Sequence, residues 1–473
     1  MITKSDKELI LELEKLPIDY WDFKEEETKS YTHGIHNYPA VMVAPISRNI
    51  IRLMKKYITI NSLFDPFSGS GTVLVEGMLA NIPNVTGNDI NPLALFISNA
   101  KTKKLELKEL HSEIIKLKNR IEEKKKSFKK IIDNIDYELK EEFELDYTSK
   151  DKWGDNAYFY LKEYCTKNGI KIDLPNFKNI GYWFKPQVII SLSIIKEEIQ
   201  KIEDINIKNY IFVAFSESIR LVSNRRNGEF KLFRMKPEKV SEFKPDVFSE
   251  FLKILDRNEE KMQEFIEELK DNNSTVKIYS DNACSLENVE NDKYDLIITS
   301  PPYGDSRTTV AYGEYSRLSL QWLNLYELTD KDILSVDKTL MGGDKFNKGF
   351  EFDLKSKILE EAIDNISKQD SKRAGDVYSF YKDLDLALKN ISQKTKKGGY
   401  QFWVVGNRTV KNELLKTDEI ISELAKQYEL ETIYTINRNI PNKVMPSLNS
   451  PTNEIGKKVT TMTMEHIVIL KKV

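Results

Sequence analysis

The feature that most constrains the fold is a succession of a short apolar run, a glycine-containing turn and a helix-like stretch at residues 58–80. The pattern is then repeated, because apolar runs that end in turn residues alternate with helix-like stretches as far as residue 100. Such alternation is typical of parallel β-α-β units. It predicts an α/β fold built on a mostly parallel sheet.

The turn itself reads DPFSGSGT, from Asp65 to Thr72. Glycines at such a turn let the backbone come close to a ligand, and the N-terminus of the next helix offers unpaired N–H groups. The turn lacks the Gly-Lys-Ser/Thr of a phosphate-binding loop, and Leu74 stands where a dinucleotide site needs glycine. Asp89 ends the next strand, where such folds place a carboxylate on ribose hydroxyls. The pattern favours an adenosine-containing cofactor, with a purely structural turn as the alternative.

A second motif, Ser-Pro-Pro-Tyr at 300–303, follows the apolar run YDLIIT and ends it abruptly. Proline cannot continue a central strand, so the chain must leave the sheet at this point. The carboxyl ends of strands are the positions at which open α/β sheets bind ligands. Residues 300–303 are therefore a second candidate for the ligand site, with a purely structural turn as the alternative.

The long segment between the two motifs predicts a second domain. Residues 101–150 carry apolar residues at helical spacing with lysines between them, and further helix-like segments continue to about residue 271. The strand pattern returns only near residue 275, far beyond the length of an ordinary connection. We expect residues 1–103 and 272–473 to form the catalytic domain and residues 104–271 a helical insertion. A helix at about 413–427 and two final strands complete the prediction.

Composition excludes several classes of protein. Lys and Arg total 72 against 74 Asp and Glu, a net charge of −2, so a non-specific DNA coater is not expected and any nucleic-acid surface must be local. The two cysteines, Cys165 and Cys284, lie far apart and suggest neither a zinc site nor a disulfide framework. The N-terminal residues are charged and resemble neither a secretory signal nor a membrane anchor, and we expect a cytoplasmic protein.

The motifs FSGSG (67–71) and SPPY (300–303) resemble those of the amino-directed DNA methyltransferases, the N4-cytosine and N6-adenine enzymes. The resemblance extends to residues 31–47, to Asp281-Asn282 and to residues 377–407, about 250 residues in four blocks, and leaves the insertion uncovered. It implies a Rossmann-like fold with a seven-stranded sheet and a terminal antiparallel hairpin. It also implies S-adenosylmethionine (AdoMet) as cofactor, double-stranded DNA as substrate, and a role in restriction-modification with a cognate endonuclease, or in host DNA marking.

The resemblance also implies residue roles. Ser300 Oγ and the Pro301 carbonyl would accept hydrogen bonds from the target amine, and Tyr303 would stack on a base flipped out of the duplex. Asp65 would hold the ammonium of the methionine moiety and Asp89 the ribose. The implied catalytic residues are Ser300, Pro301, Pro302 and Tyr303, and the implied cofactor-binding residues are Tyr38, Pro39, Asp65, Phe67, Gly69, Gly71, Asp89, Asp281 and Asn282.

Basic residues near aromatic ones are candidates for DNA contact, although an ordinary surface would carry the same pattern. They are Arg225, Arg226, Lys231 and Arg234, which accompany Phe230 and Phe233, and Arg307 and Arg317 after the catalytic motif. His33 and His36 have no third ligand beside them, so packing roles are expected rather than a metal site.

Serine at the first position of the catalytic motif favours cytosine N4 as the target, a tendency of the family rather than a consequence of the spacing. N6-adenine methylation of DNA is the first alternative, and methylation of guanine N2 in tRNA is the second. A non-catalytic DNA-binding subunit is an alternative of a different class, but such a subunit would not need both intact motifs.

Overall fold

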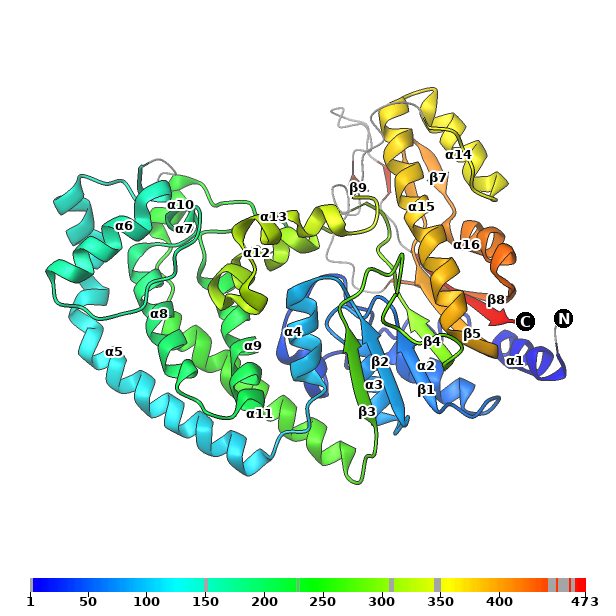
Figure 1. Cartoon of the computed structure of the whole chain (residues 1–473), viewed down its shortest axis with the longest axis horizontal. Helices are drawn as coiled ribbons and strands as arrows, with labels where there is room; N and C mark the ends of the chain where they lie inside the picture. The colour runs from blue at the N-terminus through cyan, green and yellow to red at the C-terminus, as the bar shows by residue number, and fades with distance from the viewer. Residues whose placement is uncertain are drawn as a thin grey trace.

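The computed structural model describes residues 3–148, 152–226, 228, 230–305, 310–343, 350–440, 448–449, 459–460 and 464–473. Figure 1 shows a mixed sheet with a layer of helices beyond one edge and a smaller group of helices toward the other. The two chain ends lie near each other, on the side of the sheet away from the larger helical layer (Figure 1).

The central sheet has seven strands in the order β3-β2-β1-β4-β5-β11-β8. Their bounds are β1 (Ser62–Asp65), β2 (Asn84–Asn88), β3 (Thr275–Tyr279), β4 (Tyr294–Thr299), β5 (Thr395–Val405), β8 (Leu430–Asn439) and β11 (Met464–Lys472). Neighbours from β3 to β5 pair in parallel, whereas β11 is antiparallel to both β5 and β8. The mostly parallel sheet and the terminal antiparallel hairpin are both confirmed.

Alternate residues of the central strands face opposite layers of helices. Leu63 of β1 packs toward α2 and α3, whereas its neighbour Phe64 packs toward α15 and α16. The helices of the catalytic part are α1 (Lys4–Glu14), α2 (Ala44–Met54), α3 (Thr72–Leu79), α4 (Pro92–Lys101), α12 (Tyr312–Leu323), α13 (Asp330–Thr339), α14 (Lys357–Ser367), α15 (Ser371–Lys394) and α16 (Thr417–Ala425), with short 3-10 helices η1 (Tyr31–Ile35), η2 (Leu325–Glu327) and η3 (Lys426–Tyr428). Because β1 and β4 are covered on both faces, their central residues are apolar: Leu63 and Phe64 in β1, and Leu296, Ile297 and Ile298 in β4.

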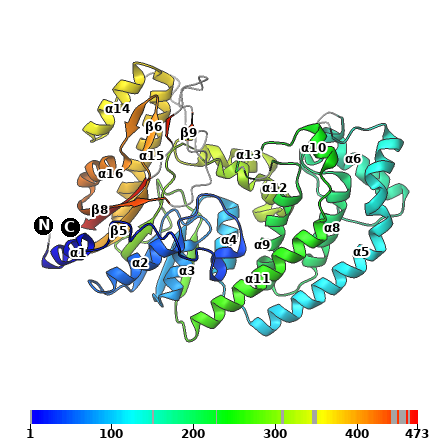
Figure 2. The ribbon, with the colours of Figure 1, turned by 180° about the vertical axis from the view of Figure 1, so that it is seen from behind.

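The connection from α4 to β3 is mostly helical, as far as the structure describes it. They are α5 (Leu107–Phe143), α6 (Lys152–Lys167), α7 (Ile180–Trp183), α8 (Pro186–Gln200), α9 (Ile205–Val222), α10 (Pro237–Glu242) and α11 (Val247–Leu269). Figures 1 and 2 show them as a layer beyond the β3 edge. Local signals fix their starts: the Asp204 carboxylate, for example, accepts hydrogen bonds from the N–H groups of Asn206 and Ile207 and caps α9.

The helical layer shares one hydrophobic core with α4 and α12 of the catalytic part. Leu93 and Ile97 of α4, Ile211 and Phe215 of α9, and Leu318 of α12 all belong to it. No helix in the described ranges has both the length and the apolar character that crossing a bilayer requires.

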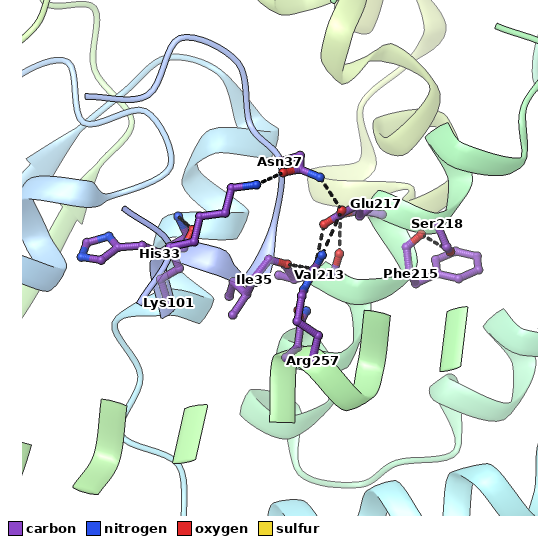
Figure 3. Close-up of polar contacts among 12 residues, drawn as sticks. His33, Ile35, Asn37, Lys101, Val213, Phe215, Glu217, Ser218 and Arg257 are labelled. Atoms are coloured by element: carbon purple, nitrogen blue, oxygen red, sulfur yellow. Dashed lines mark hydrogen bonds and ion pairs between the residues drawn. The ribbon is translucent and has the colours of Figure 1, made fainter. Parts of the chain in front are cut away.

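A polar joint, a set of partly buried hydrogen bonds around Glu217, reinforces this contact, as Figure 3 shows. Glu217 of α9 accepts hydrogen bonds from Arg257 Nη2 of α11 and from Asn37 Nδ2, each at 2.9 Å. Arg257 also donates to the carbonyl of Ile35 at 3.0 Å. The joint therefore fixes the segment that leads from η1 to Tyr38, beside the cavity described below.

Two short hairpin elements were not expected from the sequence. β6 (Arg408–Val410) pairs with β7 (Glu413–Leu415), so the helix predicted from about residue 413 begins only at Thr417. Outside the central sheet, β9 (Leu448–Asn449) also pairs with β10 (Val459–Thr460).

Candidate active site

The glycine turn and the Ser-Pro-Pro-Tyr motif meet at one cavity, at the carboxyl ends of β1, β2, β3 and β4. The cavity is open to solvent, and the space between its walls, open solvent included, measures about 850 Å³. Of the residues that the sequence nominated, Tyr38, Pro39, Asp65, Phe67, Gly69, Asp89, Asp281, Asn282, Ser300 and Pro302 line it. The two motifs, more than two hundred positions apart in the chain, are adjacent because β1 and β4 are neighbouring strands.

The two glycines of the turn have different functions in the fold. Gly69 lines the cavity with φ +49°, and its N–H donates to Asp89 Oδ2 at 2.8 Å. Gly71 is the N-cap of α3 with φ +86°, and a Cβ there would lie 2.9 Å from Ser98 Cβ. Gly71 is not among the residues that line the cavity, and its missing side chain lets α3 pack against α4.

Asp65 lies at the end of β1 and is only 3% exposed. Burial raises the pKa of Asp65 to about 7, against the opposing effect of hydrogen bonds from Thr299 Oγ1 at 2.8 Å and from the N–H of Phe67 at 3.1 Å. In the part of the chain that the structure describes, this carboxyl group has no ion-pair partner. A buried carboxylate without a counter-charge is stabilised by a cationic ligand.

Two further carboxylates follow β2 and β3. Asp89 accepts hydrogen bonds from the N–H groups of Gly69 and Asn91, and burial raises its pKa. Asp281 is held by Asn288, whose N–H and side-chain amide donate to its two oxygens at 2.8 and 2.6 Å. The cavity thus presents one carboxylate at the end of each of three adjacent strands.

An aromatic wall closes the cavity on the side of the helical layer. Tyr38 stacks on Tyr312 with ring centroids 6.2 Å apart, and its hydroxyl accepts a hydrogen bond from Asn91 Nδ2 at 3.0 Å. Tyr312, Asn91 and Met341 line the cavity but were not singled out in the sequence. Asn91 had a local signal, since it lies two residues after Asp89 and directly before Pro92, whereas nothing local marks Tyr312 or Met341.

In the catalytic motif, Ser300 and Pro302 line the cavity, whereas Pro301 is buried behind them and Tyr303 is outside the lining. The Tyr303 hydroxyl accepts a hydrogen bond from Ser300 Oγ at 3.3 Å and donates to Glu465 Oε1 at 3.0 Å. Thr299, directly before Ser300, bonds Asp65. The end of β4 therefore connects the serine to the buried carboxylate.

The candidate DNA-contacting residues separate into groups. Arg225 is buried, and its guanidinium donates to the carbonyls of Arg220 and Arg226, so its assignment to DNA contact is corrected to a structural role. Arg234 is half-buried, and its Nε donates to the carbonyl of Tyr182 at 2.7 Å, which is again a structural contact. Arg226 is exposed over the ring of Phe233.

Of the other three candidates, two are half-buried. Lys231 is half-buried in the same loop. Arg317 is half-buried on α12, where its charge opposes the effect of burial on the pKa of Asp337. Arg307 lies outside the described residues. The two histidines of the N-terminal segment have packing contacts. His33 Nε2 contacts Glu76 at 2.8 Å, and His36 is buried against the ring of Tyr315.

The residues present fit AdoMet. The unpaired Asp65 carboxyl suits an ammonium group, Asp89 suits ribose hydroxyls, and the aromatic and apolar walls suit an adenine ring. Gly69 leaves the cavity open beside Tyr38, because a Cβ there would already approach Tyr38 Cε1 to 3.8 Å.

Comparison with known proteins gives concordant results. The family model of the D12 class N6 adenine-specific DNA methyltransferases matches residues 44–224. The chain is 40% identical to the type II methyltransferase M.MvaI of Kocuria varians over 99% of this chain and 98% of that protein. It is 24% identical to the type II methyltransferase M.MjaII of Methanocaldococcus jannaschii, over 69% of each chain.

Among solved structures, the rRNA methyltransferase aviRa of Streptomyces viridochromogenes aligns over 92% of this chain and 88% of its own. The sequence identity is 9% and the TM-score 0.29, a likeness too loose to support a conclusion. The near full-length relationship to M.MvaI is of a different order, since it includes both motifs and the helical layer between them. On this relationship, the chain belongs to the amino-directed DNA methyltransferase family.

Proposed function

We propose that this protein transfers a methyl group from AdoMet to the exocyclic N4 amine of cytosine within a specific sequence of double-stranded DNA. The observation that carries the proposal is the junction at the end of β4. Thr299 bonds the buried Asp65 carboxyl, and the next residue, Ser300, turns into the same cavity. The group proposed to hold the cofactor's ammonium and the group proposed to hold the target amine are therefore fixed to each other.

The chemistry asks little of the protein as a base. AdoMet, when bound, supplies an electrophilic methyl group. An exocyclic amine shares its lone pair with the ring, so it becomes nucleophilic only when its two N–H groups are held in a geometry that favours a tetrahedral nitrogen. Ser300 Oγ and the Pro301 carbonyl are the proposed acceptors. The amine proton becomes acidic only as the new bond forms, so neither acceptor has to be strongly basic.

A base inside a duplex cannot reach such a cavity, so the target nucleotide must be flipped out. Tyr303 follows the two prolines and is proposed to contact the flipped base. The helical layer and the region after the catalytic motif are proposed to read the flanking sequence. Because both named relatives are type II methyltransferases, we also propose a role in restriction-modification, with a cognate endonuclease as the natural partner.

Adenine N6 is the second candidate, and a specific observation favours it. The family model that matches residues 44–224 describes N6-adenine enzymes. Against it stands Ser300 at the first position of the catalytic motif, which resembles the N4-cytosine enzymes. Both amines present two N–H groups and the same chemistry, so the proposed mechanism is shared.

The test is transfer of labelled methyl groups from AdoMet to unmethylated genomic DNA and, in parallel, to bulk tRNA, followed by nucleoside analysis. We expect N4-methylcytosine in DNA. N6-methyladenine would keep the mechanism and correct the base, whereas label in tRNA alone would overturn the DNA assignment. Ser300→Ala is expected to lose most activity, while the exposed Ser127→Ala on α5 serves as the matched control.

A further inference from the structure

A chain of polar contacts leads from Ser300 away from the cavity into the antiparallel end of the sheet. Ser300 Oγ contacts the Tyr303 hydroxyl at 3.3 Å, and this hydroxyl contacts Glu465 Oε1 at 3.0 Å. The other carboxylate oxygen, Glu465 Oε2, is paired with Arg438 Nη1. Glu465 of β11 and Arg438 of β8 are direct cross-strand partners, so the sheet itself sets this pair.

Arg438, at the end of this series of contacts, fixes which atom donates in each of its hydrogen bonds. A guanidinium can only donate and a carboxylate can only accept, so Tyr303 must give its single proton to Glu465. The Tyr303 oxygen can then only accept from Ser300. Ser300 must give its own single proton to Tyr303, which leaves the lone pairs of Ser300 Oγ to face the cavity.

The far end is firmly held. The Arg438 side chain is 3% exposed, and its Nε donates to the carbonyl of Trp21 at 2.8 Å while Nη2 donates to that of Asp22 at 3.3 Å. Burial together with the charge of Glu465 raises the pKa of Tyr303 well above its ordinary value, so the tyrosine keeps its proton. If the hydrogen bonds ran in the opposite direction, a lone pair of the Tyr303 oxygen would face the Glu465 carboxylate, which is unfavourable at a buried site.

We propose that Tyr303, Glu465 and Arg438 are positioning residues that keep Ser300 Oγ a hydrogen-bond acceptor, so that the cavity selects a base with an amine and rejects its deaminated counterpart. The inference rests on the proposed function, in which Ser300 meets the exocyclic group of the target. Cytosine and adenine offer an N–H to this oxygen, whereas uracil and hypoxanthine offer a carbonyl oxygen, which would face another acceptor.

Glu465→Gln tests the proposal with almost no change in shape. Because Arg438 can only donate, it keeps the amide oxygen of the new side chain on its own side, and the amide nitrogen must face Tyr303. Tyr303 then accepts from Gln and donates to Ser300, and Ser300 turns its proton toward the cavity. The variant should therefore prefer a carbonyl where the wild-type protein prefers an amine.

The measurement is the ratio of dissociation constants for two duplexes that differ only at the target base, with S-adenosylhomocysteine present to prevent turnover. The duplexes carry cytosine or uracil, or adenine or hypoxanthine if adenine is the methylated base. We expect Glu465→Gln to shift this ratio by roughly tenfold or more toward the carbonyl base, as exchanging a matched for a mismatched buried hydrogen bond requires. The mispair created by uracil is common to both proteins and cancels in the comparison.

Two further variants complete the design. Tyr303→Phe keeps the ring but frees the Ser300 proton, and it should shift the ratio in the same direction by a smaller factor. Glu198→Gln, which alters another buried carboxylate paired with an arginine, and Tyr428→Phe, which removes another tyrosine–carboxylate bond, should leave it unchanged. A ratio equal to that of the wild-type protein in both Glu465→Gln and Tyr303→Phe would overturn the proposal. An incorrect target base would already appear in the nucleoside analysis.

Discussion

At the scale of the residue, the proposed cofactor-binding role of Asp65 predicts a dependence of cofactor affinity on pH. Its carboxyl must be ionised to hold an ammonium group, yet burial raises its pKa to about 7. We therefore expect the affinity for S-adenosylhomocysteine to weaken by up to about tenfold per pH unit as the pH falls below 7. Calorimetric titration between pH 5.5 and 7.5 measures this, and Asp65→Asn should bind weakly with no such dependence. A pH-independent affinity in the wild-type protein would contradict the assignment.

The raised pKa of Asp65 has the opposite consequence for the stability of the ligand-free protein, which is higher at low pH. The folded pKa of Asp65 exceeds its ordinary value of 3.8, so the folded state binds a proton more tightly than the unfolded state. The contribution of this group to stability is complete below about pH 4 and is lost as the pH rises through about 7. A cationic ligand offsets the unfavourable burial of the ionised Asp65 carboxylate. The stabilisation of the protein by such a ligand should therefore increase as the pH rises from about 4 to about 7.

The packing role of Gly71, which lets α3 approach α4, can be tested by substitution. Gly71→Ala meets two penalties, a left-handed φ of +86° and a contact of 2.9 Å with Ser98 Cβ. Gly398 has a similar φ of +81°, but a methyl group added there would meet nothing within 4 Å, so Gly398→Ala meets only the first penalty. We expect Gly71→Ala to lower the free energy of unfolding by about 1–3 kcal/mol more than Gly398→Ala does. Adding Ser98→Gly should recover most of the difference, as urea titration would show.

Residues of the site that stand at a turn after a strand could be predicted, because the chain direction alone brings them to one edge of the sheet. Asp65, Asp89 and Ser300 are of this kind. Tyr312 could not be predicted, since it reaches the cavity only through the packing of α12 on α4 and α9. Arg225 was misassigned because a charge pattern does not reveal that backbone carbonyls satisfy the guanidinium.

At the scale of the element, α12 connects the helical layer to the cavity. Its Trp322 is fully buried and meets Phe177, Phe184 and Phe215 edge-on, with ring centroids 5.5 to 6.2 Å apart. Trp322→Ala should lower the free energy of unfolding by roughly 3–5 kcal/mol. Because Tyr312 begins the same helix, affinity for S-adenosylhomocysteine should fall as well.

Leu334→Ala on α13 is the control for this experiment, since that side chain is 46% exposed. It should change the free energy of unfolding by less than about 0.5 kcal/mol. If Trp322→Ala lowered the free energy of unfolding but left the affinity for S-adenosylhomocysteine unchanged, the proposed link between α12 and the cavity would be wrong.

The strands were more predictable than their surroundings for a physical reason. A strand buried on both faces has an apolar centre followed by turn residues, as β1 has in Leu63 and Phe64 and β4 has in Leu296, Ile297 and Ile298. The β6–β7 hairpin has three residues per strand, too few for a period-2 pattern, and Glu413–Leu415 looked like the start of α16. Short elements held by tertiary contacts carry little local signal.

At the scale of the whole molecule, the helical layer shares one hydrophobic core with α3 and α4, whereas the two faces of the sheet belong to separate cores. The division at residues 104 and 271 remains our proposal for where the insertion lies. Ile211 and Phe215 of the insertion pack with Leu93 and Ile97 of the catalytic part, so deleting residues 110–270 would expose that surface to water. Recognition of DNA by the insertion is better tested at its surface than by deletion.

The loop before α10 is the surface to test. Phe230 and Phe233 are 46% and 47% exposed, and Arg226 lies over the Phe233 ring. The loop is tied to the cavity's own helix, since Phe230 packs on Tyr315 and the Leu232 N–H donates to Glu314. Exposed aromatic rings and a guanidinium beside the proposed catalytic cavity suit a nucleic-acid backbone and unstacked bases.

Arg226→Gln should therefore weaken DNA binding at every sequence and lower the slope of log affinity against log salt by about one, as the loss of one phosphate contact requires. Phe233→Ala should weaken binding by about 1–3 kcal/mol if the ring stacks on a base. Neither change touches the cavity lining, so affinity for S-adenosylhomocysteine should stay constant. Lys126→Gln, on the exposed face of α5, is the charge-matched control. If Arg226→Gln behaved like Lys126→Gln in both affinity and salt slope, the assignment of this loop to DNA contact would be wrong.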